Sequence, residues 1–258
     1  MAPVILTLRE NPDKFRVKIL ATGQHREMLD QVLEVFALRP DADLNLMRPD
    51  QSLEALTARA IEEISRYLKS DRPDLILIQG DTTTMMAAAL AGFYLRIPFG
   101  HVEAGLRTGN LYAPYPEEFN RRMAAMVARY HFAPTRNAAD NLLLEGIDPE
   151  NIKITGNTVI DALLHTISTT SPPALPFPEQ APYVLMTCHR RENFGRPVRE
   201  IFSTVRDFFT SHPDIILWYP VHPNPNVQKP AYEILGGTST IYLTEPPNSP
   251  ALSHAILG

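Results

Sequence analysis

The chain has 258 residues, of which 44% are hydrophobic and 21% are charged, and its formal net charge is -5. These proportions are close to the average of soluble globular proteins and exclude a disordered or fibrous chain. The negative balance and the scattered basic residues argue against nucleic acid or an anionic membrane surface as a partner. A chain of this length predicts one large or two modest domains.

Cysteine usage and the N-terminal residues bear on the cellular compartment. Cys188 is the only cysteine, which excludes an internal disulfide and fits a reducing cytoplasm. The apolar N-terminal MAPVILTL has no basic region before it and no small-residue cleavage site after it. No stretch approaches the roughly 18 apolar residues that a membrane span needs. We therefore expect a soluble, cytoplasmic protein.

Apolar runs of strand length alternate with segments of helical period, which predicts a parallel sheet covered by helices. The chain opens on residues 1–11, whose apolar positions have helical spacing. Five strands are then expected at 15–23, 74–80, 97–101, 130–134 and 152–156. Six helices are expected at 24–38, 52–70, 82–96, 116–130, 135–146 and 157–166.

A change of composition separates this first series from a second one. Residues 167–182 are rich in Pro, Ser and Thr and show neither period, so they are predicted to be an interdomain linker. This places an N-terminal domain at 1–166 and a C-terminal domain at 183–258. The second series has expected strands at 183–188, 215–221 and 240–245 and expected helices at 198–213, 230–236 and from Ser249 onward.

Both ends of the chain have the pattern of a cut domain. A doubly wound domain normally begins with a strand, whereas this chain begins with a helical pattern. At the other end the chain stops inside a helix, after three strands of the second series. We therefore expect a second domain that is incomplete.

Acidic residues follow the expected strands of the first domain. Asp81 comes after the second strand, Glu103 after the third, and Glu117 and Glu118 open the helix that follows. In doubly wound sheets ligands bind beyond the carboxyl ends of the strands. Neighbouring, partly desolvated carboxylates can exchange protons near neutrality. The pattern predicts an acid/base set at this edge of the sheet.

Each of these acids also has a purely structural interpretation. Asp81 or Thr82 would cap the following helix. Glu103 would pair with Arg107, and acids in the first helical turn are favoured by the helix dipole. These alternatives are individually open, but they explain the combination of acids less well than a shared site does.

In the second domain, His189 and Arg190 directly follow an expected strand and resemble an anion site, with a solvated charged face as the alternative. The histidines at strand ends lack metal-ligand spacing such as HExxH, so no metal is expected. There is no GxGxxG after a strand and no Walker A motif, which argues against a bound dinucleotide or a P-loop ATPase.

Six ordered motifs resemble those of the non-hydrolysing UDP-N-acetylglucosamine 2-epimerases over essentially the whole chain. They are TGQHREMLDQVL, QGDTTTMMAAALAGFY, GHVEAGLRTGNLYAPYPEEFNRR, ITGNTVIDAL, TCHRRENFG and YPVHPNPNV. The resemblance implies an α/β fold of two doubly wound, Rossmann-like domains of the glycosyltransferase-B type with the substrate in the cleft between them. It implies conversion of UDP-N-acetylglucosamine to UDP-N-acetylmannosamine without NAD or another cofactor.

The resemblance also implies roles for particular residues. The family's catalytic carboxylates fall on Asp81, Glu103 and Glu117. Four further matches are His189, a catalytic position near the diphosphate, and Gln24, Arg190 and His222, which line the substrate or activator pocket. UDP-N-acetylglucosamine is thereby expected as the substrate and, as in bacterial members, as an activator, and a homodimer is expected for the full-length form.

The chain departs from the family pattern at both ends. Family members open with a strand and a GTRPEAIK loop whose basic residues approach the diphosphate, and they carry a DSGGxQEE segment near the C-terminal nucleotide site. Neither segment occurs in this sequence. We therefore expect a truncated chain with little activity by itself.

Three other functions are compatible with these motifs. A glycosyltransferase-B transferase would use the same nucleotide sugar but pass the sugar to an acceptor. A hydrolysing epimerase would release free N-acetylmannosamine and UDP. A nucleotide-sugar-binding fragment would bind without turnover.

Overall fold

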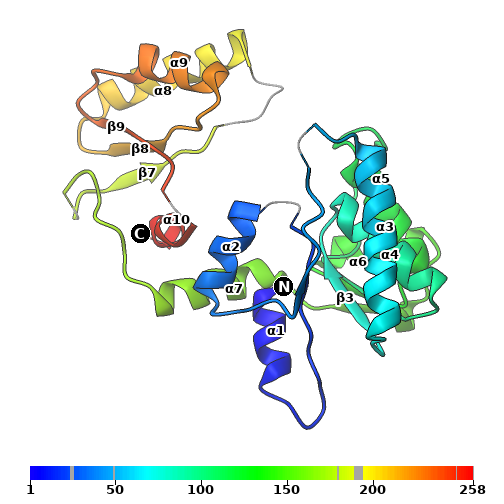
Figure 1. The fold of residues 1–258 in the computed structure, drawn as a ribbon. Helices are drawn as coiled ribbons and strands as arrows, with labels where there is room; N and C mark the ends of the chain where they lie inside the picture. The colour runs from blue at the N-terminus through cyan, green and yellow to red at the C-terminus, as the bar shows by residue number, and fades with distance from the viewer. Residues whose placement is uncertain (24–25, 49, 179, 189–193, 248, 258) are drawn as a thin grey trace. The chain divides into compact units, whose positions relative to one another are not determined.

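The computed structural model describes residues 1–23, 26–48, 50–178, 180–188, 194–247 and 249–257. The chain divides into two compact units, Met1–Leu164 and His165–Gly258 (Figure 1). Helix α7 (Thr158–Thr169) crosses this division and continues into the segment predicted to be a linker. In its last turn, which extends beyond the predicted end at Thr166, the Ser168 and Thr169 hydroxyls both donate to the His165 carbonyl at 2.8 Å.

The first unit is built on a parallel sheet of four strands in the order β3-β4-β5-β6. These strands are β3 (Ile76–Gln79), β4 (Phe99–Val102), β5 (Tyr130–Ala133) and β6 (Ile152–Ile154). The helices that accompany them are α3 (Leu53–Ser70), α4 (Thr83–Tyr94), α5 (Glu117–Val127) and α6 (Arg136–Leu144). A short 3-10 turn, η1 (Pro149–Asn151), precedes β6. Four of the five expected strands are therefore confirmed.

The expected first strand is much shorter than the apolar run 15–23. Only β1 (Leu20–Ala21) is a strand, and it pairs in parallel with β2 (Ala42–Asp43), which was not predicted. On the N-terminal side of β1, the Ile19 amide donates to the Asp41 carboxylate at 2.8 Å and not to a backbone carbonyl of the partner strand. Two helices flank this ladder in sequence, α1 (Ala2–Arg9) and α2 (Arg26–Val35). The helical spacing of residues 1–11 is confirmed.

Side-chain caps fix where the helices of the first unit begin. The Ser52 hydroxyl accepts from the Ala55 amide at 3.3 Å, the Thr82 hydroxyl from Met85 at 3.2 Å, and the Thr135 hydroxyl from Ala138 at 3.1 Å. The capping interpretation of Thr82 is thus confirmed. Helix α4 has little polar surface because α3 and α5 both pack against it, and its buried residues include Met85, Met86 and the alanines 87–89.

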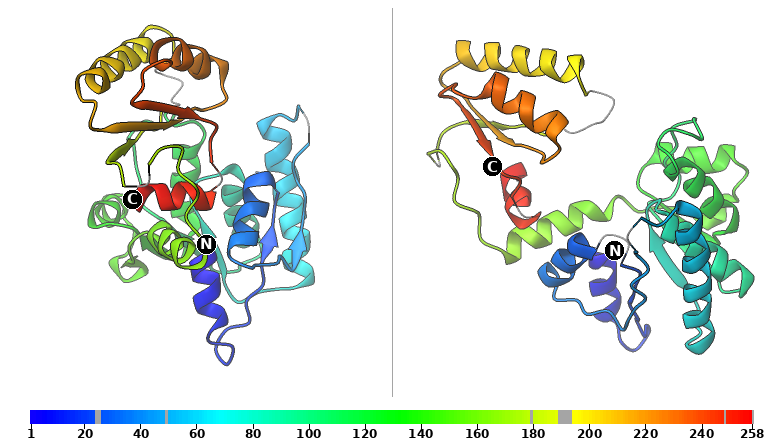
Figure 2. Two further views of the ribbon diagram at one scale, coloured as in Figure 1. Left: turned by 90° about the vertical axis from the view of Figure 1, so that its left-hand side faces the viewer. Right: turned by 45° about the horizontal axis from the view of Figure 1, so that its top comes forward.

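The second unit contains a parallel sheet in the order β7-β8-β9. Its strands are β7 (Tyr183–Leu185), β8 (Ile216–Pro220) and β9 (Ile241–Thr244), and its helices are α8 (Arg196–Ser211), α9 (Pro225–Leu235) and α10 (Ser249–Leu257). Figures 1 and 2 show α8 and α9 side by side over this sheet. Helix α9 begins earlier than predicted because Asn224 caps it and Pro225 occupies its first position.

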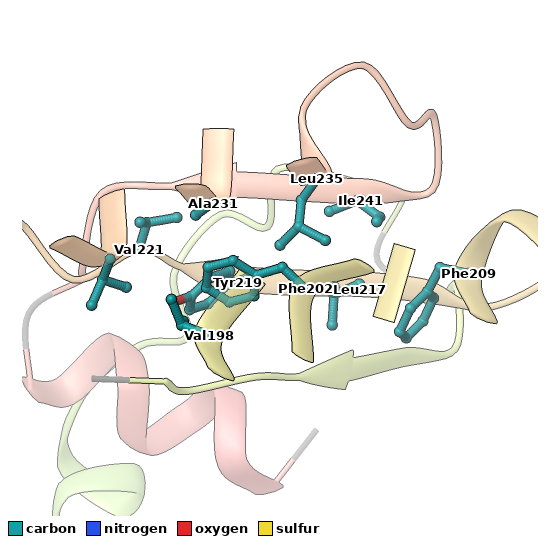
Figure 3. Packing of buried hydrophobic residues seen from close by; sticks show 10 residues of the cluster. Val198, Phe202, Phe209, Leu217, Tyr219, Val221, Ala231, Leu235 and Ile241 are labelled. Carbon is teal, nitrogen blue, oxygen red and sulfur yellow. The ribbon is translucent and has the colours of Figure 1, made fainter. Parts of the chain in front are cut away.

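The core of the second unit lies between these helices and the sheet (Figure 3). Phe202 of α8 packs on Tyr219 of β8 with ring centroids 5.7 Å apart, and both side chains are fully buried. Leu217, Leu235 and Ile241 add to the cluster from two strands and α9. Across the described part of the chain, no helix is both long and apolar enough to cross a lipid bilayer.

Candidate active site

Two neighbouring strands of the first unit bring predicted acids to one edge of the sheet. Gln79 at the end of β3 is the register partner of Val102 at the end of β4, and the Gly80 amide donates to the Val102 carbonyl at 3.2 Å. Asp81 and Glu103 follow directly after these positions. The structure therefore places both acids at the carboxyl ends of adjacent parallel strands, as a doubly wound sheet requires of a ligand site.

Side chains of helix α5 fix the position of Asp81 through hydrogen bonds. Its Oδ2 accepts two hydrogen bonds from Arg121, one from Nε at 3.0 Å and one from Nη2 at 2.6 Å. Its backbone carbonyl accepts from Asn120 Nδ2 at 2.8 Å. Neither Arg121 nor Asn120 was predicted as a site residue, although both stand in the PEEFNRR motif, one helical turn after the acids of α5.

Glu118 is a second partner of Arg121 and is completely buried. Its carboxylate accepts from the Thr108 amide at 3.1 Å, from Arg122 Nε at 3.3 Å and from Arg121 Nη1 at 3.4 Å. Burial acts to raise the pKa of Glu118, but these bonds, together with the charge of Arg107, outweigh it and hold the pKa below its ordinary value. Glu118 is therefore an anion that organises the start of α5.

Glu103 has an unusual backbone conformation and two amide partners. Its φ is +67°, a left-handed value that is costly for a residue with a side chain and that recurs at active sites. Its Oε2 accepts from Gln79 Nε2 at 3.3 Å and its Oε1 from Asn157 Nδ2 at 3.4 Å. The carboxylate is thus oriented by neutral donors from the ends of β3 and of the loop after β6.

The alternative that Glu103 pairs with Arg107 is wrong. Arg107 instead donates to both oxygens of Glu145 at 2.7 Å, a bidentate pair. The Arg107 side chain is only 7% exposed, and its guanidinium holds the pKa of Glu145 below its ordinary value. Arg107 therefore ties the loop after β4 to the end of α6 and leaves Glu103 to its amide partners.

Glu117 opens α5 and is half-buried. Its Oε2 is buried and has no hydrogen-bond partner within the described part of the chain. Buried polar oxygens are normally satisfied, and those that are not call for an explanation such as a functional role. Glu117 is therefore suited to meet a polar group of a ligand.

Two buried histidines lie within the strands that lead to this edge of the sheet. His101 of β4 and His131 of β5 are register partners. His101 Nε2 lies 2.8 Å from the Gly80 carbonyl, which fixes the residue before Asp81. Burial lowers the pKa of His101 to about 4, helped by the neighbouring His131 and Arg107 and opposed by the bond to Gly80 and by Asp81. A neutral ring that donates from Nε2 fits this position.

These histidines give the first unit a pH-dependent stability. An unfolded histidine binds a proton near pH 6.5, whereas folded His101 does so only near pH 4, so acid favours the unfolded state. We expect the free energy of unfolding to fall by about 2 kcal/mol between pH 7 and pH 5 because of His101 alone. Burial also lowers the pKa of His131, which adds to the same trend.

The measurement is amide hydrogen exchange of β4 and β5 at several pH values, in the unaltered chain and in His101→Asn. The variant should show a flatter dependence between pH 7 and pH 5. Glu118 and Glu145 also have lowered pKa values, but their contribution is lost only at lower pH, below the ordinary value of 4.5. An unchanged slope in the variant would contradict the expectation.

Four of the predicted residues are not among the described residues of the first unit. Gln24, His189 and Arg190 lie outside the described residues. His222 follows β8 in the second unit, where its Nδ1 accepts from the Asn224 amide at 3.1 Å. Within the described residues, no group of three or more His, Cys, Asp or Glu side chains could hold a metal ion. The described part of the candidate site therefore consists of Asp81 and Glu103 at adjacent strand ends and of Glu117 at the start of α5.

Comparison with known proteins gives one consistent result. The family model described as UDP-N-acetylglucosamine 2-epimerase matches residues 7–256. The UDP-N-acetylglucosamine 2-epimerase of Escherichia coli (strain K12) is 48% identical over 256 residues, which is 95% of this chain and 68% of that protein. The enzyme of the same name from Bacillus subtilis (strain 168) is 44% identical over 264 residues, which is 100% of this chain and 69% of that protein.

Solved structures agree with the sequences. The crystal structure of UDP-GlcNAc 2-epimerase from Neisseria meningitidis bound to UDP-GlcNAc matches with a TM-score of 0.88 at 41% identity, over 98% of this chain and 71% of that one. A lipopolysaccharide outer core galactosyltransferase, WaaB, matches with a TM-score of 0.51 at 14% identity, which is a likeness of fold alone. The predicted α/β fold of glycosyltransferase-B type is confirmed. The chain belongs to the UDP-N-acetylglucosamine 2-epimerase family.

Proposed function

We propose that the protein is a non-hydrolysing UDP-N-acetylglucosamine 2-epimerase, an isomerase that interconverts UDP-N-acetylglucosamine and UDP-N-acetylmannosamine. The observation that carries the proposal is the carboxylate set at the edge of the first sheet. Asp81 and Glu103 follow adjacent strands and are each fixed by hydrogen bonds, and Glu117 presents a buried oxygen without a partner in the described chain. These are the acids that the family motifs select.

Carboxylates suit this reaction because of the chemistry at C2 of the sugar. The C2 hydrogen is not acidic in the substrate, since no carbonyl group adjoins it. When the bond from C1 to the phosphate oxygen breaks, UDP leaves with the electron pair and positive charge develops at C1. A carboxylate then takes the C2 proton, and the electrons of that bond form the C1–C2 double bond of a glycal.

The return reaction inverts the centre. A carboxylic acid on the opposite face gives a proton to C2, and UDP adds back to C1. Since one face loses the proton and the other receives it, two proton-handling groups are needed. A fixed anion in addition stabilises the positive charge on the sugar. Asp81, Glu103 and Glu117 supply three carboxyl groups for these tasks.

Residues from both halves of the chain complete the proposal. We assign His189 to stabilisation of the departing diphosphate as a catalytic residue, and Gln24, Arg190 and His222 to the pocket for substrate or activator. Imidazolium and guanidinium groups are suited to phosphate oxygens. No metal or organic cofactor takes part in the scheme. UDP-N-acetylglucosamine is also proposed as an activator, and the full-length form is proposed to be a cytoplasmic homodimer.

The test is a proton NMR time course of UDP-N-acetylglucosamine in deuterated water with the unaltered chain. Loss of the C2 proton signal, with the manno isomer appearing and no acceptor present, is the expected result. Free N-acetylmannosamine and UDP would indicate a hydrolysing epimerase instead. Calorimetric binding without exchange would indicate a binding fragment, and turnover only with an added acceptor would indicate a transferase.

A further inference from the structure

We propose that Arg121, itself held by Glu118, is a positioning residue that keeps the Asp81 carboxylate at a fixed place and orientation in the site. The proposal rests on the proposed function, because it assumes that Asp81 acts on the bound sugar. Under this proposal, two charged residues of α5 stand behind the acids at the edge of the sheet. Arg121 and Glu118 are needed for Asp81 to act on the sugar at its full rate.

The first observation is the geometry of the contact with Asp81. Arg121 Nε and Nη2 both donate to the same oxygen, Oδ2, at 3.0 and 2.6 Å. Two donors from a planar, rigid guanidinium define the position of that oxygen more sharply than one donor would. In the part of the chain that the structure describes, no hydrogen bond reaches the other oxygen, Oδ1. The Asp81 side chain is 29% exposed, so Oδ1 is the oxygen available to a substrate.

The second observation is how Arg121 itself is fixed. Its side chain is 15% exposed, and its Nη1 donates to Glu118 Oε2 at 3.4 Å. Glu118 is fully buried and is anchored in turn by the Thr108 amide of the loop before α5. The guanidinium therefore bridges a buried anion and a partly exposed one. Such a bridge gives Arg121 little freedom to leave Asp81.

The third observation is that α5 also binds the backbone of Asp81 through a hydrogen bond. Asn120, adjacent to Arg121, donates to the Asp81 carbonyl at 2.8 Å, and its side chain is buried. Both the main chain and the carboxylate of Asp81 are thus set by one helical turn. This matters for catalysis because charged groups stabilise a developing cation best when they need no rearrangement during the reaction.

The kinetic test compares Arg121→Met, Arg121→Lys and a matched control, Arg136→Met, in which an exposed arginine at the start of α6 undergoes the same change. Arg121→Met is expected to lower kcat for C2 exchange about 10²-fold while KM changes little, since a misplaced group costs about that much. Arg121→Lys should recover part of the rate, because lysine restores the positive charge but not the two planar N–H donors of the guanidinium. The control should behave as the unaltered chain.

A kcat that is unchanged in Arg121→Met would overturn the proposal. The same loss of kcat in all three variants would also overturn it, because the effect would then not depend on the contact with Asp81. Far-ultraviolet circular dichroism of all three variants shows whether each is folded before its kinetics are compared.

A second measurement does not depend on turnover. In protein labelled with ¹³C at aspartate carboxyl carbons, the Asp81 signal is assigned by its loss in Asp81→Asn. We expect this signal to shift in Arg121→Met and in Glu118→Gln but not in Arg136→Met. An unmoved signal in Arg121→Met would overturn the positioning role. If the unaltered chain shows no C2 exchange, the proposed function fails, while the carboxyl signal still decides whether Arg121 governs Asp81.

Discussion

Replacing Glu103 with glutamine is expected to slow hydrogen exchange at C2 of UDP-N-acetylglucosamine by about 10²–10⁴-fold, the usual loss when a group that transfers a proton is removed. Glutamine has nearly the same shape but does not accept a proton at this position. Gln79 Nε2 and Asn157 Nδ2 both donate to the Glu103 carboxylate. A glutamine offers an acceptor to only one of them and opposes the other with its own NH₂ group.

The control for this substitution is Glu150→Gln, which makes the same chemical change at an exposed glutamate in η1 (Pro149–Asn151). Exchange should be unaffected there. Calorimetry with UDP-N-acetylglucosamine should show that Glu103→Gln still binds the nucleotide sugar within a few-fold of the unaltered chain. Full exchange activity in Glu103→Gln would remove this acid from the mechanism, and we expect comparable losses for Asp81→Asn and Glu117→Gln.

Much of the fold follows from local signals in the sequence. Helix α3 runs over Leu53–Ser70 because Ser52 caps an amphipathic segment, and α6 begins after Thr135 for the same reason. The strands β3 and β8 are predicted directly by short apolar runs with polar residues after them. The ladder of β1 with β2 could not be predicted in this way, because Ala42–Asp43 has no apolar run and is defined only by its partner.

The sequence selects candidate site residues by their motifs, but it does not give the contacts that these residues make. The family motifs predict Asp81, Glu103 and Glu117 as the acids. They do not predict the partner of Asp81, which lies on a helix 40 residues further along the chain. Arg107 likewise pairs with Glu145, 38 residues away, and not with the nearby Glu103. Local periodicity contains no information about such pairs, since they depend on which helix ends the fold brings to a strand end. The left-handed backbone of Glu103 is also a product of tertiary structure.

Gly105→Ala is expected to destabilise the first unit by about 4 kcal/mol, through two separate terms. Gly105 has φ +85°, and a side chain in this left-handed region costs about 1–2 kcal/mol. An added Cβ would also lie 2.1 Å from the Ala138 carbonyl oxygen of α6. Overlap of this kind costs about 1–3 kcal/mol, and the upper end applies because a helix carbonyl cannot rotate away as a flexible side chain can.

Gly109→Ala separates the two terms, because Gly109 has φ +79° but a Cβ added there would meet no atom of the described chain within 4 Å. This control should therefore lose only the conformational part, about 1–2 kcal/mol. Hydrogen exchange of β5 and α6 in increasing urea measures both variants within the first unit. Equal losses at the two glycines would mean that α6 can move away from the loop after β4. In that case the loop that carries Glu103 is not fixed by close packing on α6, and its geometry depends on the Asn141 side chain, which donates to the Gly105 carbonyl at 2.9 Å.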